Sequence, residues 1–592
     1  MKDRLLSLLT HRRLPWILAL LGVVLCSPSL WMGIYIDDYL HQLKLQAHPL
    51  FNALGHPSME LFRFFPGGEG NQALFEAGIM PWWSHPDIRI AFWRPLSSAT
   101  HLLDHTLWPD NFLPAHLHSL AWYAVAILVV TTLYRKLIPT SAAAGLAAWM
   151  FAIEDSHAMA TAWLANRNAL LPLIFGAFAL MAHIRWQQEH KHRFLAVAIL
   201  AFILALSGGE AALGALAYIV AWQLTLADRR GTARLTPLIP YALIVLVWRI
   251  LYNHLGYGAY GSGPYIDPAN EPIAFLAGLA QRGPLLLASL FTQAPIDPWI
   301  FIPPSAQWVL VFLGCGVVAI LVRLFLPLLE NSALARFFGL GMLLSMVPVC
   351  ASFPMDRLCI QMGIGAFGLI ALLAQHRGFL HAEPASTEEP SAFHRRGIKG
   401  LLLVHAVMAA LLLPGRVMSA GSFFEVAEQP SKSITKSPEL AEQTLIWINS
   451  MDLLLGYMVA ERAYKKETVP KRVGLLCSMF AENHVTRVDE DTLEIRPVGG
   501  FLASYTDRMS RSDKLGFTQG QRIPTPDFEV EVTEVLENGR PKAARFHFNK
   551  PLEDPSYHWV ATGPQGAEPF QPPAMGETTV LPPISPLFAM RQ

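Results

Sequence analysis

Long apolar runs recur along the first 420 residues, and they restrict the fold of this chain more than any other feature. About eleven of them approach the roughly 20 residues that a helix needs to cross a hydrocarbon core. Inside a bilayer every backbone polar group must be satisfied within the protein, so such runs form helices. We therefore expect a polytopic α-helical membrane protein. The expected spans are about residues 14–36, 116–134, 140–154, 164–184, 194–207, 210–227, 235–253, 307–328, 335–352, 359–376 and 397–418.

The composition agrees with a membrane protein and excludes some other classes. Hydrophobic residues make up 53% of the chain and charged residues 15%, whereas soluble globular proteins carry about 25% charged residues. The formal net charge is zero, so no overall positive field favours nucleic acid. The five cysteines form no CxxC pair, which argues against a structural zinc site. Glu154, Asp155 and His157 lie close in sequence, but their spacing is not specific for a metal, and no metal site is predicted there.

Lysine and arginine collect in alternate loops between the expected spans. Cytoplasmic loops carry an excess of these residues, so we place these loops in the cytoplasm. The N-terminus is then cytoplasmic, and residues 37–115, 254–306 and the C-terminal tail are extracytoplasmic. We expect an integral protein of a plasma membrane, the bacterial inner membrane, while a eukaryotic endomembrane stays open. The basic clusters are Lys2–Arg13, Arg135–Lys136, Arg185–Arg193, Arg229–Arg234, Arg323–Arg336 and Arg377–Lys399.

The first extracytoplasmic loop, residues 37–115, is too long for a simple connection and too apolar to be disordered. The segments "HPLFNALGHPSMELFRFF" and "NQALFEAGIMPWW" are typical of short amphipathic helices at the membrane interface. Trp82 and Trp83 fit an aromatic belt at that interface. This loop and the spans together form the expected membrane domain, residues 1–420.

The character of the sequence changes after about residue 420. Residues 421–434 are expected to form a linker, and residues 435–592 a soluble extracytoplasmic domain. Two apolar segments that are typical of strands, "TLIWI" and "RVGLLCSMF", flank a helix near residues 451–465. Two alternating segments flank Glu537-Asn538-Gly539, which indicates a β-hairpin. We expect a small α/β or β-rich domain.

Two aspartates, Asp37 and Asp38, directly follow the first apolar run. An ionisable group at membrane depth is costly and usually faces a cavity or a partner. The expected topology brings further acids, arginines and histidines to the same end of the spans, where they could surround an anionic lipid headgroup and a polar acceptor. Arginine suits phosphate because its planar fork bonds two oxygens. The candidates are Asp37, Asp38, Arg94, His116, Glu154, Asp155, His157, Arg167, Glu210, Asp356 and Arg357.

Each candidate also has a structural interpretation. An acidic pair at a helix end can mark the water boundary. Arg94 and Arg167 can extend to the interface along their apolar stems. His116 begins a span and can serve packing. Glu210 lies where a span begins, and a carboxylate is favoured in the first turn of a helix.

Five sequence elements follow the acidic pair in order: "FWRPLSSATHLLDHTLW" with Arg94, "PAHLHSLAWY" with His116, "AWLANRNALLPLIF" with Arg167, "SGGEAAL" with Glu210 and "MDRLCIQMG" with Arg357. This order resembles the GT-C membrane glycosyltransferases. The closest similarity is to the protein O-mannosyltransferases and the transmembrane mannosyltransferases that carry tetratricopeptide repeats. The resemblance covers roughly residues 14–420. The sequence departs from the family pattern at Ser119, Asn168, Gly209 and Gln361, and no tetratricopeptide array follows the membrane part.

The resemblance implies a sugar donor linked to a polyprenyl phosphate or diphosphate. Asp37 would be the general base on the acceptor hydroxyl, and the reaction would invert the anomeric configuration. Asp38 would orient the site, bind a cation or touch the acceptor. No resident cofactor is expected, and a divalent cation stays open. The predicted site comprises the catalytic acids Asp37 and Asp38, the phosphate-binding arginines Arg94, Arg167 and Arg357, and the supporting residues His116, Glu210 and Asp155.

We therefore expect a hexosyl- or mannosyltransferase-like enzyme of the cell envelope, acting in protein glycosylation or on a lipid or glycan acceptor. Its expected partners are the lipid-linked donor, the acceptor and membrane lipids, with no nucleic acid. Two alternatives stay open. The same fold could serve a non-catalytic transporter, flippase or assembly scaffold, or the C-terminal domain could be a binding module on a membrane anchor.

Overall fold

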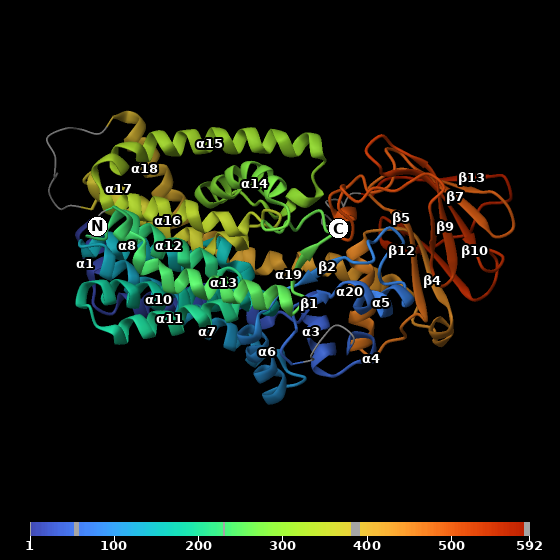
Figure 1. The fold of residues 1–592 in the computed structure, drawn as a ribbon, viewed down its shortest axis with the longest axis horizontal. Coiled ribbons are helices and arrows are strands. Elements are labelled where there is room, and N and C mark those ends of the chain that lie inside the picture. Colours follow the sequence, from blue (N-terminus) through green and yellow to red (C-terminus); the bar gives the residue numbers. More distant parts are fainter. Residues whose placement is uncertain (1, 53–57, 229–230, 381–390, 585–592) are drawn as a thin grey trace.

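The computed structural model describes residues 2–52, 58–228, 231–380 and 391–584. It shows a bundle of helices with a C-terminal domain of strands at one end, and the N-terminus lies at the opposite end of the bundle (Figure 1). The chain is therefore a polytopic helical membrane protein with a C-terminal β-containing domain, as the sequence predicts.

Eight helical segments of the described residues are long and apolar enough to cross a membrane. They contain α2 (Leu14–Cys26), α7 (Phe112–Leu137), α10 (Leu170–Glu189), α13 (Ile239–His254), α14 (Pro272–Thr292), α15 (Pro304–Asn331), α17 (Ile360–His376) and α18 to α19 (Ala392–Leu403 and Ala409–Ser433). Four shorter apolar helices accompany them: α8 (Ser141–Ala152), α11 (His192–Gly208), α12 (Ala212–Thr225) and α16 (Ala333–Val349). Each expected span coincides with one of these twelve helical segments. The remaining segment, α14, was not expected to be a span.

Helix α14 corrects the expectation that residues 254–306 are a loop. Glu271, just before α14, pairs with Lys514 of the C-terminal domain. At the other end of α14, Phe291 packs against His405 inside the bundle. The chain then returns to the C-terminal domain, where the ring of Trp299 lies 4.8 Å from that of Tyr505. The segment thus enters the bundle and comes back to the end where the C-terminal domain lies. The sidedness of the spans stays a prediction.

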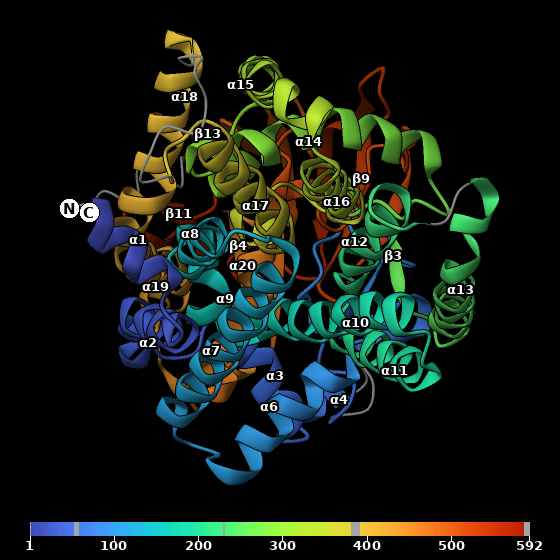
Figure 2. The same cartoon turned by 90° about the vertical axis from the view of Figure 1, so that its left-hand side faces the viewer.

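Helix α17 lies in the middle of the bundle, between α8 and α16 (Figure 2). Buried residues make up 89% of its most apolar window. Glycines create the close packing, because a Cβ on Gly365 would lie 2.4 Å from the carbonyl oxygen of Phe338 and one on Gly368 would meet the Phe338 ring. Small residues allow membrane helices to approach in this way. The packing sets the start of α17, and Arg357 lies in the short 3-10 turn, Asp356–Cys359, directly before it.

The first loop packs against the C-terminal domain. It contains the helices and strands α3 (Asp37–Leu45), α4 (Pro49–Asn52), β1 (Arg63–Phe65), α5 (Gln72–Glu76), β2 (Arg89–Ala91) and α6 (Pro95–Leu107). Strands β1 and β2 form a three-stranded antiparallel sheet with β3 (Gly258–Tyr260).

One of the two segments expected to be an amphipathic helix at the membrane interface, residues 48–65, includes residues 53–57, which lie outside the described part of the chain. For the other, residues 71–83, the expectation was wrong, because its helix α5 is only five residues long. The aromatic belt was also wrong. Trp82 and Trp83 are 4% and 1% exposed, and Trp82 donates a hydrogen bond to the carbonyl of Leu476 in the C-terminal domain. These tryptophans join the first loop to that domain.

The C-terminal domain has two sheets. The first has the order β12-β11-β4-β5, with β4 (Thr444–Ser450) parallel to β5 (Arg472–Ser478) and to β11 (Tyr557–Gly563). The parallel pair β4 and β5 is connected by α20 (Asp452–Tyr464), which is the predicted strand-helix-strand unit. Strand β12 (Gly566–Pro569) is antiparallel to β11.

The second sheet is antiparallel, with the order β13-β6-β7-β10-β9-β8. Its strands are β6 (Asn483–Arg487), β7 (Thr492–Pro497), β8 (Arg522–Pro524), β9 (Phe528–Val535), β10 (Pro541–Phe548) and β13 (Thr578–Leu581). Strands β9 and β10 form the predicted hairpin around Glu537-Asn538-Gly539. Alternate residues of β9 are buried, as a half-buried strand requires.

Helix α19 joins the two parts of the chain. It continues from the last apolar segment to Ser433, so the region expected to be a linker, 421–434, is helical for almost its whole length. The division of the chain into domains at 420 and 435 stays a prediction.

Candidate active site

The acidic pair lies at the N-terminus of α3, just after the first membrane helix. Asp37 and Asp38 occupy the first turn of α3, where carboxylates face the positive end of the helix dipole. The preceding residue, Ile36, has φ 42°, a backbone conformation that β-branched residues seldom adopt. Such strain persists only where the surrounding structure holds it, and it is found preferentially at functional sites. Ile36 therefore marks a constrained turn directly beside Asp37.

A cavity of about 1380 Å³ lies between the end of the bundle, the first loop and the C-terminal domain. Asp37 and Arg357 both line it, together with Trp163, Tyr265 and, from α20 of the C-terminal domain, Tyr457. Asp37 and Tyr457 are 420 positions apart in the chain. The first acid and the late arginine thus share one cavity, and each part of the protein contributes to it.

Asp37 is partly buried in this cavity and held by one hydrogen bond. The hydroxyl of Tyr457 donates to its Oδ1 at 2.8 Å. Burial raises the pKa of Asp37 above its ordinary value, although the Tyr457 bond and the positive charges of Arg357 and Arg94 act in the opposite direction. A carboxylate with a raised pKa is a better general base near neutral pH than an exposed one.

Arg357 lies in the turn just before α17 and is positioned by neutral partners. Its Nη1 donates to Oδ1 of Asn166 at 2.9 Å, and its Nε lies 3.3 Å from the sulfur of Met355. Its guanidinium lies over the ring of Trp163, 5.2 Å from the ring centroid. Among the residues that the structure describes, no carboxylate forms an ion pair with Arg357. Its charge is therefore available to an anionic group in the cavity.

The other two predicted phosphate-binding arginines are already paired with acids. Nε of Arg94 lies 2.8 Å from Oε2 of Glu210, and its guanidinium covers the ring of Phe92 at 4.5 Å. Tyr252 donates a second hydrogen bond to Glu210, at 3.2 Å. Neither Arg94 nor Glu210 is among the residues that line the cavity in the described part of the chain. This pair joins the first loop to the bundle.

Arg167 is fully buried, with 0% exposure. Its Nη2 lies 2.7 Å from Oδ2 of Asp104, and its Nε donates to Oγ of Ser119 at 3.0 Å. It also donates to the carbonyls of Ala115 and Thr100. Arg167 lies in the 3-10 turn before α10 and thus connects this turn to α6 and α7. It is not among the described residues that line the cavity.

Asp38 and His116 hold the chain around the first helix. Asp38 is 3% exposed, and its two oxygens accept hydrogen bonds from the backbone N–H groups of Ala165, at 2.7 Å, and Tyr35, at 3.1 Å. Burial raises the pKa of Asp38 to about 8. Nε2 of His116 lies 3.1 Å from the carbonyl oxygen of Gly33. Neither side chain lines the cavity in the described residues.

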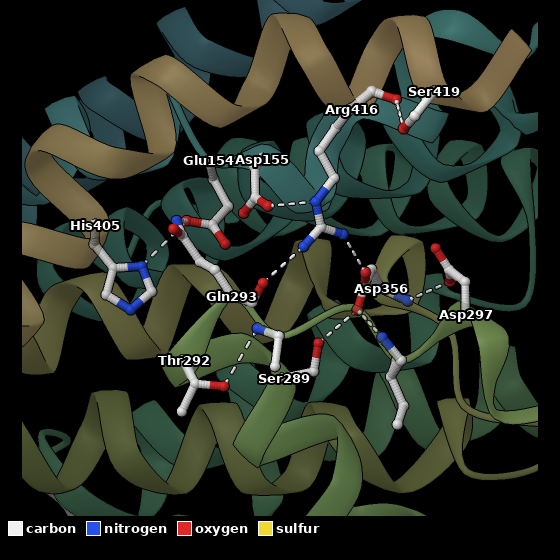
Figure 3. A network of polar contacts seen from close by, with 12 residues as sticks. Glu154, Asp155, Ser289, Thr292, Gln293, Asp297, Asp356, His405, Arg416 and Ser419 are labelled. Carbon is white, nitrogen blue, oxygen red and sulfur yellow. Dashed lines mark hydrogen bonds and ion pairs between the residues drawn. The ribbon is translucent and has the colours of Figure 1, made fainter. Parts of the chain in front are cut away.

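Asp155 belongs to a separate buried network (Figure 3). Arg416 of α19 lies at its centre, with Nε 2.7 Å from Asp155 Oδ2 and Nη1 2.5 Å from Asp356 Oδ2. Nδ1 of His405 lies 3.3 Å from Glu154 Oε2. Burial and the adjacent Glu154 raise the pKa of Asp155 to about 7. The network includes Asp356 (Figure 3), which is the neighbour in sequence of the cavity residue Arg357.

Two important residues were missed from the sequence. Arg416 lies in the last apolar segment, and an arginine within such a segment is by itself a signal of a buried partner. Tyr457 carries no comparable signal, because its contact with Asp37 depends on how the C-terminal domain docks. Among the described residues, no group of three or more His, Cys, Asp or Glu is arranged to hold a metal ion, and we name no ligand set for a divalent cation.

No protein-family model and no curated protein matches the sequence. The structure is similar to that of the oligosaccharyltransferase of Archaeoglobus fulgidus, tethered with an acceptor peptide, at 12% identity and a TM-score of 0.38; the match covers 79% of this chain and 64% of that one. It is also similar to ArnT from Cupriavidus metallidurans bound to undecaprenyl phosphate, at 13% identity and a TM-score of 0.33, covering 76% and 84% of the two chains.

Both of these proteins are GT-C glycosyltransferases, the superfamily that the sequence elements resemble. This chain spans about two thirds of the length of the oligosaccharyltransferase that it matches. Because both TM-scores are below 0.5, no role of either protein is transferred to this chain.

Proposed function

We propose that the protein is a membrane glycosyltransferase. It moves a sugar from a polyprenyl-phosphate-linked donor to an acceptor hydroxyl on the extracytoplasmic side, with inversion at the anomeric carbon. The observation that carries this proposal is the shared cavity of Asp37 and Arg357. One side chain is an acid with a raised pKa and the other a cation without a carboxylate partner among the described residues.

One side chain suits the leaving phosphate of the donor, and the other suits the attacking hydroxyl of the acceptor. Arg357 binds the phosphate that links sugar and lipid, and it stabilises the charge that grows there as the bond to the anomeric carbon breaks. Asp37 accepts the proton of the acceptor hydroxyl, whose oxygen forms the new bond to the anomeric carbon. The polyprenyl phosphate then leaves with the bonding electrons. A positioned base contributes about 10²–10⁴-fold in rate.

Tyr457 completes this arrangement from the C-terminal domain. By donating to Oδ1 of Asp37 it leaves Oδ2 for the acceptor hydroxyl and holds the carboxylate in one orientation. Positioning of this kind lowers the entropic part of the barrier. The C-terminal domain is then part of the active site as well as a neighbour of it.

The remaining predicted residues act on structure in this proposal. They fix the positions of the segments around Asp37 through ion pairs and hydrogen bonds. These residues are the pair Arg94–Glu210, the buried Arg167, and Asp38 and His116, which contact backbone groups. The N-terminus is proposed to be cytoplasmic and the C-terminal domain extracytoplasmic, in a bacterial inner membrane. The acceptor is a protein, lipid or glycan of the cell envelope.

The test is a transfer assay with the purified full chain in lipid nanodiscs and a panel of radiolabelled polyprenyl-phosphate sugars. Envelope extracts from cells that lack the protein supply the acceptor. Label is expected to move from donor to acceptor with the wild type and not with Arg357→Ala. Binding of the donor without transfer, for every donor and extract, would instead favour the non-catalytic transporter, flippase or scaffold.

A further inference from the structure

The part of the cavity that the first loop and the C-terminal domain form together has an apolar lining. We call it the apolar chamber and define it by Phe64, Phe65 and Met80 of the first loop and Met479, Phe480 and Met509 of the C-terminal domain. Resting on the proposed function, we propose that the acceptor is a lipid. Its apolar body lies in the apolar chamber and its hydroxyl reaches Asp37.

The chemistry of the lining is the first support. Among the described lining residues of the whole cavity, the charged ones are Asp37, Arg357, Asp452 and Glu568, and most of the remainder are aliphatic or aromatic. A glycan or an extended peptide carries many polar groups, and each one buried without a partner is costly. An apolar body carries no such cost here.

The size of the cavity is the second support. Its volume of about 1380 Å³ exceeds the roughly 300–1,000 Å³ of sites for drug-sized ligands. A single sugar and a phosphate at Asp37 and Arg357 occupy one end of this space. The remaining apolar space is a poor place for water, which needs polar partners, and a lipid body fills it.

Methionines give the third support. Six of the 19 methionines of the chain line the cavity: Met80, Met159, Met355, Met451, Met479 and Met509. The methionine side chain is unbranched and polarizable, and it is common on surfaces that adapt to varied apolar ligands. Such a lining suits acyl chains, which differ in length and bending.

The donor does not account for this lining. Its polyprenyl chain remains in the bilayer, and its phosphate therefore reaches Arg357 from the helical bundle. The residues that define the apolar chamber come from the first loop and the C-terminal domain, and none of them belongs to a candidate membrane helix. The acceptor is the substrate that approaches Asp37 from the chamber.

The experiment uses a photoactivatable diacylglycerol with a diazirine in one acyl chain as the lipid-hydroxyl probe. The purified full chain in phosphatidylcholine nanodiscs is irradiated with the probe, and adducts are mapped by mass spectrometry. Adducts are expected on the segment that contains Met479 and Phe480, and excess undecaprenyl phosphate is expected to leave them in place. Phe480→Asn should lower their yield at least several-fold.

The matched control is Ile523→Asn, which alters a partly buried apolar side chain of β8 that is not among the cavity-lining residues. It should leave the adduct yield unchanged. An equal loss in both variants, or adducts confined to the membrane helices, would overturn the proposal. Displacement of the probe by undecaprenyl phosphate would assign the chamber to the donor chain. Displacement by a serine-containing aliphatic peptide would assign the chamber to a protein acceptor. Either result would overturn the proposal of a lipid acceptor.

The failure of the proposed function would look different. Binding of undecaprenyl phosphate, measured by thermal shift with wild type and Arg357→Ala, is expected to depend on Arg357. If adducts form in the chamber but binding of undecaprenyl phosphate does not depend on Arg357, the glycosyltransferase proposal is contradicted, and the role of the chamber as an acceptor site is contradicted with it. If adducts form only outside the chamber while binding of undecaprenyl phosphate depends on Arg357, only the proposal of a lipid acceptor is contradicted.

Discussion

Replacing Tyr457 by phenylalanine removes one hydrogen bond and leaves the ring in place. That bond, 2.8 Å from the hydroxyl to Oδ1 of Asp37, stabilises the charged carboxylate and therefore lowers its pKa. Hydrogen bonds to charged groups contribute about 1.5–3 kcal/mol, and one pKa unit corresponds to about 1.4 kcal/mol. Because water in the cavity replaces part of the lost bond, we expect the pKa of Asp37 to rise by about one unit.

The consequence is a shift in the pH dependence of transfer. A general base must be deprotonated, so the acidic limb of the kcat/KM profile follows the pKa of Asp37 in the free enzyme. In Tyr457→Phe this limb should move to higher pH by about one unit, and kcat/KM well above it should be lower than in the wild type, because the carboxylate is no longer held in one orientation. The matched control is Tyr39→Phe, which removes a 2.8 Å hydrogen bond to Glu428 and should leave the limb where it is. An unmoved limb in Tyr457→Phe, or one moved to lower pH, would refute the assignment of Asp37 as base.

The other predictions separate residues that act on substrate from residues that act on structure. Arg357→Ala should keep the protein folded but weaken donor binding about 10–100-fold, from the loss of a charge-assisted contact; an unchanged donor Kd would contradict its role. Arg167→Ala leaves buried Asp104 without its partner and should cost about 3–5 kcal/mol, seen as loss of folded protein in thermal unfolding, and a stable but inactive variant would show instead that Arg167 acts on substrate. Asp38 has its pKa raised from 3.8 to about 8, so the folded state binds its proton more tightly than the unfolded state, and stability should fall as the pH rises between these values. Asp38→Asn should flatten that dependence while costing about 1–3 kcal/mol, because its amide nitrogen cannot accept the second backbone hydrogen bond; an unaltered pH slope would count against this account.

Local patterns predicted much of the fold. The long helices and the strand-helix-strand unit of the C-terminal domain follow from hydrophobic length and periodicity, which belong to single segments. Helix α14 was missed because its apolar run is interrupted by Gln281, Arg282, Gly283 and Pro284, and its mean hydropathy of 1.4 is the lowest among the candidate spans. The guanidinium of Arg282 donates hydrogen bonds to the carbonyl of Cys350 and the hydroxyl of Tyr505, and the sequence of α14 contains neither partner.

The site was predictable in kind but not in detail. Position after the first span indicated both Asp37 and Asp38, and the family resemblance favoured Asp37 as the base. The structure adds that Asp37 lines the cavity, whereas Asp38 accepts hydrogen bonds from backbone N–H groups. The three predicted phosphate-binding arginines look alike in sequence. They differ in their partners, since Glu210 lies 116 positions from Arg94 and the acid beside Arg167 comes from another helix, and such pairings appear only when helices pack.

The most direct test of the central claim is the single-turnover rate of sugar transfer by Asp37→Asn at saturating donor, measured beside donor affinity. The asparagine oxygen still accepts from Tyr457, so the cavity keeps its shape. The account predicts a rate about 10²–10⁴-fold below wild type with donor Kd unchanged. Transfer at the wild-type rate by folded Asp37→Asn would contradict it.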